Sequence, residues 1–175
     1  MSEMQFSRID IAQLSIAEQL KNGLRRLGKA VVVITAWHEG RRWAMTATAV
    51  SELSMDPPSL LVCINKNASL HAPLTAGAPF CVNILHADQL AVSQTCAGKL
   101  KGEERFAEGR WGSGACGSPR LCDAQASFFC EYETHIEYGT HAVVIGAVKE
   151  VHVSGDVDPL IYLDGGYARA ARLSA

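Results

Sequence analysis

The chain has 175 residues, of which 48% are hydrophobic and 19% are charged, and its formal net charge is −2. This length predicts one domain of ordinary size. The charged fraction lies below the roughly 25% of typical soluble domains, which indicates a large apolar core, a buried subunit interface, or both. No charged block argues for nucleic-acid binding, and no apolar run approaches the roughly 18 residues of a membrane span. No secretory signal is visible at residues 1–15, so we expect a cytoplasmic protein.

The six cysteines do not form a metal-binding pattern. No C-x-x-C pair occurs, and Cys116, Cys122 and Cys130 are separated by five and seven residues, which is not a usual zinc spacing. Cys63 and Cys81 lie inside apolar, strand-like runs and are expected to be buried free thiols. These features predict no metal site and a reducing environment.

A helix is predicted near the start of the chain. Ser15 and Glu18 form an S-x-x-E capping box, in which each side chain satisfies the other's free backbone N–H. Leu20, Leu24 and Leu27 then repeat at helical spacing. We expect this amphipathic helix to cover one face of the core.

From residue 30 the pattern changes to strands. Residues 30–37 form a β-branched run, residues 38–41 are typical of a turn, and residues 42–49 are the expected return strand. The prolines in 55–58 interrupt any regular element, because proline lacks the N–H donor and fixes its φ. Another strand is expected at 59–64.

The middle of the chain mixes short helices and strands. A polar turn at 65–67 leads to a short helix near Leu70. Residues 80–85 are typical of a strand and residues 88–96 of a helix. Residues 97–120 are rich in glycine and charge, which predicts a long loop.

The clearest alternation of period two comes next. Every second residue of 124–136 is apolar or small, which predicts a half-buried antiparallel strand. A turn at 137–140 leads into a return strand at 141–153, and a last short strand follows at 159–163. Many strands, few helices and no βαβ alternation predict a mainly β fold, an antiparallel barrel with peripheral helices.

The sequence contains none of the common catalytic motifs. There is no G-x-G-x-x-G after a strand, no Walker phosphate loop, no G-x-S-x-G and no H-E-x-x-H. The histidines are scattered, and no Ser/His/Asp or Cys/His arrangement can be assembled from spacing. The candidate site residues therefore lie in segments suited to binding a ligand.

Three segments could contact a ligand, and each also has a purely structural explanation. Residues 44–51 are mostly small or hydroxylated, so either a planar ligand lies close to their backbone or the strand packs under a helix. Residues 65–69 combine Asn and Ser with Lys66, which suits an anion cradle or an Asx turn that caps a helix. Residues 139–141 place His141 on a turn, as a ligand-facing donor or a solvated side chain.

In this order and spacing, the segments resemble the flavin reductase family, the short NAD(P)H:flavin oxidoreductases that serve two-component aromatic monooxygenases. The similar features extend from Leu20 to Tyr167, and they include residues 31–35, 45–49, 54–58, 65–69, 80–85, 105–106, 139–141 and 159–162. The resemblance implies a single domain over 1–175, with an N-terminal extension at 1–14 and a core at 15–167. The implied fold is an FMN-binding split β-barrel, a Greek-key antiparallel barrel, in a homodimer with sites near the subunit interface.

The resemblance also implies a site made of three groups of residues. The flavin ring and ribityl chain would contact Met45, Thr46, Ala47, Thr48 and Ser51. The phosphate end would be held by Asn65, Lys66, Asn67 and Ser69, with Arg105 as a further phosphate or adenylate contact. The nicotinamide would face His141, together with Thr140 and Tyr167. Cys96 departs from the family pattern, because relatives often have an aromatic residue there.

The implied activity is hydride transfer from NADH or NADPH to FMN or FAD. The cofactors carry the difficult electronics, so the protein has to stack the two rings and support charge on the reduced flavin. No catalytic side chain is expected. The reduced flavin would diffuse to a separate monooxygenase acting on an aromatic or phenolic substrate. Two alternatives stay open: a reductase of another acceptor, such as a corrinoid or a metal centre, and a flavin-binding module that does not turn over.

Overall fold

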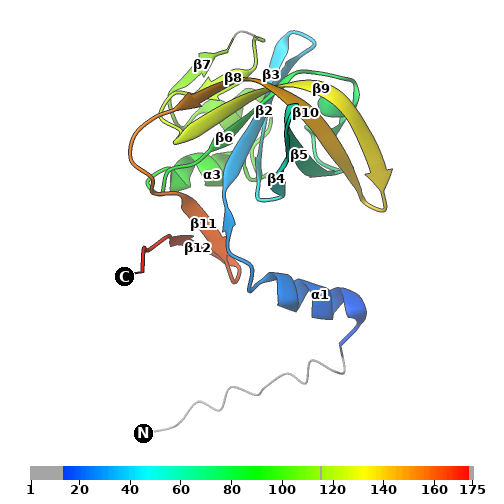
Figure 1. The fold of residues 1–175 in the computed structure, drawn as a ribbon, viewed down its shortest axis with the longest axis vertical. Helices are drawn as coiled ribbons and strands as arrows, with labels where there is room; N and C mark the ends of the chain where they lie inside the picture. Colours follow the sequence, from blue (N-terminus) through cyan, green and yellow to red (C-terminus); the bar gives the residue numbers. More distant parts are fainter. Residues whose placement is uncertain (1–13, 115, 174–175) are drawn as a thin grey trace, which may run out of the picture.

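The computed structural model describes residues 14–114 and 116–173, and an antiparallel sheet of seven strands forms its centre (Figure 1). Its order is β3-β2-β6-β9-β10-β5-β4, with bounds β2 (Val32–His38), β3 (Arg41–Ala47), β4 (Val50–Met55), β5 (Pro58–Asn65), β6 (Phe80–Ile84), β9 (Ala126–Tyr138) and β10 (His141–Val153). The shorter strands are β1 (Lys29–Ala30), β7 (Trp111–Ser113), β8 (Pro119–Leu121), β11 (Leu160–Leu163) and β12 (Gly166–Arg169). The helices are α1 (Ile16–Leu24), α2 (His71–Thr75), α3 (Leu90–Cys96) and the 3-10 helix η2 (Gly102–Phe106).

The predicted mainly β architecture with peripheral helices is confirmed, and the barrel is split. The edge strands β3 and β4 do not pair with each other within the described ranges. Both predicted hairpins, β2–β3 and β9–β10, are present. The β2–β3 hairpin turns at Glu39 and Gly40, whose φ values of 51° and 75° suit a two-residue type I′ turn. The β5–β10 register places Asn65 opposite His141, so two predicted ligand segments become neighbours.

The central sheet separates two apolar cores. Alternate residues of β2 face opposite sides, so Ile34 packs in one core with Phe80, while Val33 packs in the other with Leu121. The strand expected at 124–136 corresponds to β9, and the prediction that it is half-buried is wrong for the first half of β9. Phe129 is only 3% exposed, because the segment after β7 packs on its ring from the second side.

The predicted loop at 97–120 is also more ordered than expected, since it contains η2, β7 and most of β8. A buried amide, that of Asn83 on β6, holds this segment against the sheet. Its Nδ2 donates to the Val33 carbonyl at 3.1 Å, and its Oδ1 accepts from the Leu121 N–H at 3.0 Å and from the Ser127 hydroxyl at 2.9 Å. One side chain therefore joins β2, β8 and β9.

Strand β4 departs from the expectation that the prolines at 57 and 58 interrupt any regular element. The structure uses them as a hairpin: β4 ends at Met55, Asp56 and Pro57 form the turn, and Pro58 begins β5. Proline is tolerated as the first residue of a strand, where its missing N–H costs no ladder bond.

Helix α1 has the predicted cap but not the predicted packing. The Glu18 N–H donates to the Ser15 hydroxyl at 3.3 Å, and the Ser15 N–H donates to the Glu18 carboxylate at 2.9 Å. No residue of α1 is buried, and Leu20 and Leu24 are 61% and 47% exposed. The expectation that this helix covers the core of its own chain is wrong, because α1 extends away from the barrel (Figure 1). Within residues 14–114 and 116–173, nothing buries its apolar stripe.

Candidate functional site

A cavity of about 650 Å³, which we call the Arg105 cavity, lies along the edge strand β3. Its walls come from β3, from the turn after β5, and from the segment that joins the end of α3 to η2. The lining residues are Arg41, Arg42, Trp43, Ala44, Met45, Thr46, Asn67, Ala68, Ser69, Cys96, Ala97, Gly98, Lys101, Gly102 and Arg105. Five of the predicted flavin residues are among them: Met45, Thr46, Asn67, Ser69 and Arg105.

Arg105 is the buried cation of this cavity, with 8% of its surface exposed. Its Nε donates to the Leu100 carbonyl at 2.8 Å, and its Nη1 donates to the Ala44 carbonyl at 2.5 Å and to the Ser69 hydroxyl at 3.3 Å. Over residues 14–114 and 116–173 it forms no ion pair with a carboxylate. A buried charge without a counter-ion is unfavourable, so this cavity is complementary to an anion.

The open edge of β3 supplies backbone groups to the same cavity. The Ala44 carbonyl points away from β2, since it accepts from Arg105, and Thr46 has the same parity along the strand. The Thr46 hydroxyl is already used, because it donates to the Ser93 carbonyl at 2.7 Å. The backbone of Thr46, rather than its side chain, is therefore available to the polar edge of a ligand.

The turn at 65–69 is an Asx turn, but it does not cap a helix as the sequence suggested. The Asn65 side-chain oxygen accepts from the Asn67 N–H at 2.8 Å, which is an Asx turn. Asn67 and Ser69 line the cavity, whereas Asn65 and Lys66 do not. The Lys66 ammonium lies 2.8 Å from the Glu137 carboxylate and holds the pKa of that carboxyl below its usual value. Helix α2 begins only at His71, so the turn is not a helix N-terminus.

The three predicted nicotinamide residues lie outside the Arg105 cavity. The Thr140 carbonyl accepts from the Lys66 N–H at 2.9 Å, and the Thr140 hydroxyl lies 2.8 Å from Nδ1 of His141. Both residues therefore border the 65–69 turn. Tyr167 lies elsewhere, with its hydroxyl 2.9 Å from that of Ser93.

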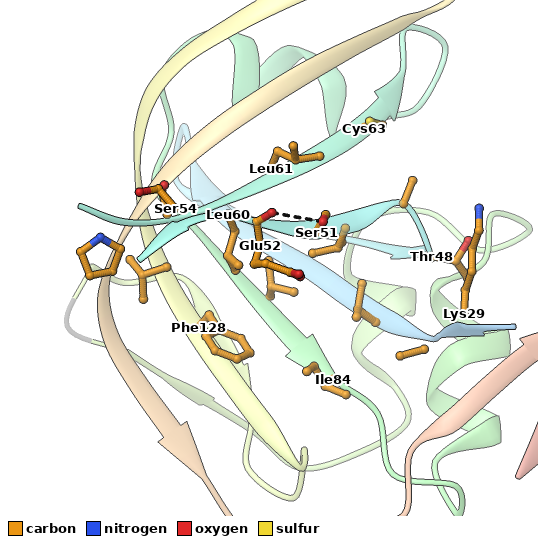
Figure 2. Close-up of a pocket in the computed structure, with 18 of the residues that line it drawn as sticks. Lys29, Thr48, Ser51, Glu52, Ser54, Leu60, Leu61, Cys63, Ile84 and Phe128 are labelled. Atoms are coloured by element: carbon orange, nitrogen blue, oxygen red, sulfur yellow. Dashed lines mark hydrogen bonds between the residues drawn. The ribbon is translucent and has the colours of Figure 1, made fainter. Parts of the chain in front are cut away.

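Thr48 and Ser51 line a second cavity, which we call the apolar groove and which has a volume of about 730 Å³ (Figure 2). Its wall includes Leu60, Leu61, Ile84 and Phe128. The Ser51 hydroxyl is bonded to the Glu52 carbonyl at 3.1 Å, as the dashed line in Figure 2 shows. Ala47 lines neither cavity. The predicted flavin contacts in residues 45–51 are thus divided between two cavities, because the chain leaves β3 after Ala47 and turns into β4.

The cavity lining also includes residues that the sequence did not mark as site residues: Arg41, Arg42, Trp43 and Lys101. The guanidinium of Arg42 forms an ion pair with Glu103, and its Cζ lies 4.1 Å from the centroid of the Phe106 ring. Cys96 packs behind Arg105, to whose carbonyl its thiol donates at 3.2 Å, and burial raises the pKa of this thiol to about 11. The signal in the sequence is the arginine pair Arg41-Arg42, which follows Gly40 directly and begins β3.

The cysteines behave as packing residues. All six are free, Cys81 is buried as predicted, and Cys63 is only partly buried at the wall of the apolar groove. In the part of the chain that the structure describes, no group of His, Cys, Asp and Glu side chains could hold a metal ion. The same part contains no helix that is long and apolar enough to span a membrane.

Comparison with known proteins decides the family. Residues 24–171 match the model of the flavin reductase like domain. The chain belongs to the flavin reductase family. It is 38% identical over 173 residues to the reductase component of the FADH(2)-dependent resorcinol hydroxylase of Rhizobium sp. strain MTP-10005, covering 98% of this chain and 97% of that one. It is 41% identical over 151 residues to the FMN reductase (NADH) RutF of Variovorax paradoxus strain S110, covering 86% and 84%.

A solved member of the flavin reductase family supports the same cofactors. The NADH:FAD oxidoreductase SgcE6 of Streptomyces globisporus C-1027, in complex with NAD and FAD fragments, superposes with a TM-score of 0.82 at 26% identity, over 89% of this chain and 93% of that one. The resemblance found in the sequence is therefore confirmed. The chain is an oxidoreductase of the flavin reductase family, and a flavin and a nicotinamide nucleotide are the cofactors named for its relatives.

Proposed function

We propose that this chain reduces flavin with NADH and releases it to a separate monooxygenase that acts on an aromatic substrate. The observation that carries the proposal is the buried guanidinium of Arg105, which lies beside Ser69 at the cavity on β3 and pairs with no carboxylate of the residues that the structure describes. This arrangement suits the phosphate of a flavin. The name of the resorcinol hydroxylase relative supports an oxygenase partner. The six free thiols support a cytoplasmic location.

The described residues can do the positioning that the reaction needs. Arg105, Ser69 and Asn67 bind the phosphate, and Met45 together with the open backbone edge at Thr46 orients the ring. A flavin and a nicotinamide, when bound, supply the hydride transfer themselves. The contribution of the chain is then to hold the two rings at reacting distance and to exclude other geometries. No nucleophile or proton relay is required of it.

The proposed assembly is a homodimer. The stripe on α1 and the apolar groove both leave apolar side chains uncovered, and exposed apolar patches often mark surfaces that another protein covers. Each surface could be covered by a second copy of the chain. We place the nicotinamide at His141, Thr140 and Tyr167, and a second copy could complete that part of the site.

The His141→Ala variant tests the nicotinamide assignment. Loss of one neutral hydrogen bond should raise the KM for NADH by about two- to tenfold. Flavin affinity should stay nearly unchanged, because His141 does not line the Arg105 cavity. Steady-state kinetics and flavin titration measure the two effects. His152→Ala, which removes a histidine bonded to Glu150 on the same strand, is the control. A collapse of flavin binding in His141→Ala would place this residue on the flavin side instead.

The function itself is tested by separating the two half-reactions. The purified chain with NADH, flavin and air should produce hydrogen peroxide and leave a phenolic substrate unchanged. Hydroxylation should appear when a separate oxygenase is added, and it should persist at lower yield when a membrane that passes flavin separates the two proteins. A hydroxylated product from this chain alone would contradict the proposal. Tight retention of flavin without NADH oxidation would instead favour a binding module, and reduction of a corrinoid but not of free flavin would favour the other acceptor.

A further inference from the structure

The backbone edge that is proposed to orient the flavin ring depends on a neighbouring helix. Thr46 is followed in β3 only by Ala47, and within residues 14–114 and 116–173 this edge strand pairs with β2 alone. The end of an edge strand opens more easily than its centre, because no second strand holds it. The Thr46 hydroxyl donates to the Ser93 carbonyl of α3 at 2.7 Å. This bond ties the ring-binding end of β3 to α3.

Helix α3 itself needs contacts with other elements to keep its position. It has seven residues, and no side chain caps its first turn. A helix of this length is marginal in water, so its position is set by packing and by hydrogen bonds to the rest of the molecule. Ser93 lies in the middle of α3 and is completely buried. A contact that fixes Ser93 therefore also fixes the acceptor of the Thr46 hydroxyl.

Strand β12 supplies such a contact. The Tyr167 hydroxyl lies 2.9 Å from the Ser93 hydroxyl, and the two form a hydrogen bond. Arg169 lies two positions further along β12 and therefore on the same face of the strand. Its guanidinium forms an ion pair of 2.5 Å with Asp88, just before α3, and a second of 3.2 Å with Asp158. One face of β12 thus holds α3 both near its start and at its centre.

From these contacts we infer that Tyr167 and Ser93 are positioning residues for the flavin ring, and that they act through the Thr46 hydroxyl. The inference rests on the proposed flavin site, in which the Thr46 backbone orients the ring. It gives the Tyr167 hydroxyl a role separate from the nicotinamide contact proposed for that residue. Arg105 has bonds of its own to two backbone carbonyls, so the phosphate contact should change little when this chain of hydrogen bonds is broken.

The test compares FMN binding in Tyr167→Phe, in Thr46→Val and in the double variant, by fluorescence titration without nicotinamide nucleotide. Each single variant loses one neutral hydrogen bond and should bind FMN about two- to tenfold more weakly. Both changes break the same chain of contacts, so the double variant should bind FMN as tightly as the weaker single variant. Ser93→Ala removes the other hydroxyl of the pair and should match Tyr167→Phe.

Two further readouts report on the ring rather than on stability. Riboflavin has the ring but no phosphate, so Tyr167→Phe should weaken its binding by the same factor as that of FMN. The visible absorption spectrum of bound FMN should shift in Tyr167→Phe and in Thr46→Val, because the ring changes its surroundings. Thr46→Ser keeps the hydroxyl and should restore both the affinity and the spectrum of the wild-type chain.

The matched control is Tyr162→Phe. Tyr162 lies opposite Tyr167 in the β11–β12 pair, and its hydroxyl has no hydrogen bond among the residues that the structure describes. This variant should leave the affinity and the spectrum unchanged. Losses that add in the double variant, or an unchanged FMN affinity in Tyr167→Phe, would overturn the inference. So would a loss for FMN but not for riboflavin, or a loss confined to the KM for NADH, because these results assign the hydroxyl to the phosphate end or to the nicotinamide. Failure of the wild-type chain to bind FMN would instead refute the proposed function.

Discussion

Replacing Arg105 with methionine should weaken flavin binding about 100-fold. Hydrogen bonds to a charged group contribute about 1.5–3 kcal/mol each, and the substitution also removes the only buried positive charge assigned to the phosphate. Titration of flavin fluorescence measures the dissociation constant. Because Arg105 also bonds the Leu100 and Ala44 carbonyls, near-ultraviolet circular dichroism should first establish that the variant is folded.

Two further variants separate charge from geometry at this position. Arg105→Lys keeps the charge and loses the planar fork, so it should restore part of the affinity but not all of it. Arg110→Met removes an exposed arginine outside the cavity and should leave the dissociation constant unchanged. A folded Arg105→Met chain that binds flavin as tightly as the wild type would remove this residue from the site.

The second large effect is expected at Asn83. Replacing it with leucine should lower the free energy of unfolding by about 3–5 kcal/mol, because the Val33 carbonyl, the Leu121 N–H and the Ser127 hydroxyl all lose a buried partner. Urea denaturation followed by circular dichroism measures this loss. Asn22→Leu is the control, since its amide donates to the Glu18 carbonyl on the exposed surface of α1, and a change within about 1 kcal/mol is expected there. An Asn83→Leu chain as stable as the wild type would show that β8 is held by other contacts.

The elements that were predictable are those specified by neighbouring residues. The type I′ turn at Glu39-Gly40 and the capping box of Ser15 and Glu18 each depend on interactions within four residues. The alternation in β9 also predicted a long strand, but it could not show that a distant hairpin covers the second face. The segment that covers this face is held by Asn83, whose hydrogen-bond partners lie on three separate strands, β2, β8 and β9.

In the candidate site too, features that depend on neighbouring residues were predictable, and features that depend on distant residues were not. The 65–69 turn was found from its own residues, and Asn67 and Ser69 do line the Arg105 cavity. The Lys66 side chain was expected to hold the phosphate, but it meets Glu137, which lies 71 positions further along the chain. Likewise, Arg41 and Lys101 become neighbours of one cavity only through folding, so no spacing rule could join them. The resemblance to a family predicted the flavin ligand, whereas the pattern of charges around the Arg105 cavity is visible only in the tertiary structure.

The uncovered stripe of α1 has a consequence for the stability of this helix, which lies among the first residues that the structure describes. An isolated helix shorter than about 12–15 residues is marginal in water, and α1 has nine residues with none buried. The capping box stabilises its first turn but cannot by itself stabilise the whole helix. In the proposed homodimer the remaining stability comes from contact with the second copy, so that folding of α1 and association form a single linked equilibrium. At high dilution this segment would lose helical structure while the barrel, with its two buried cores, stays folded.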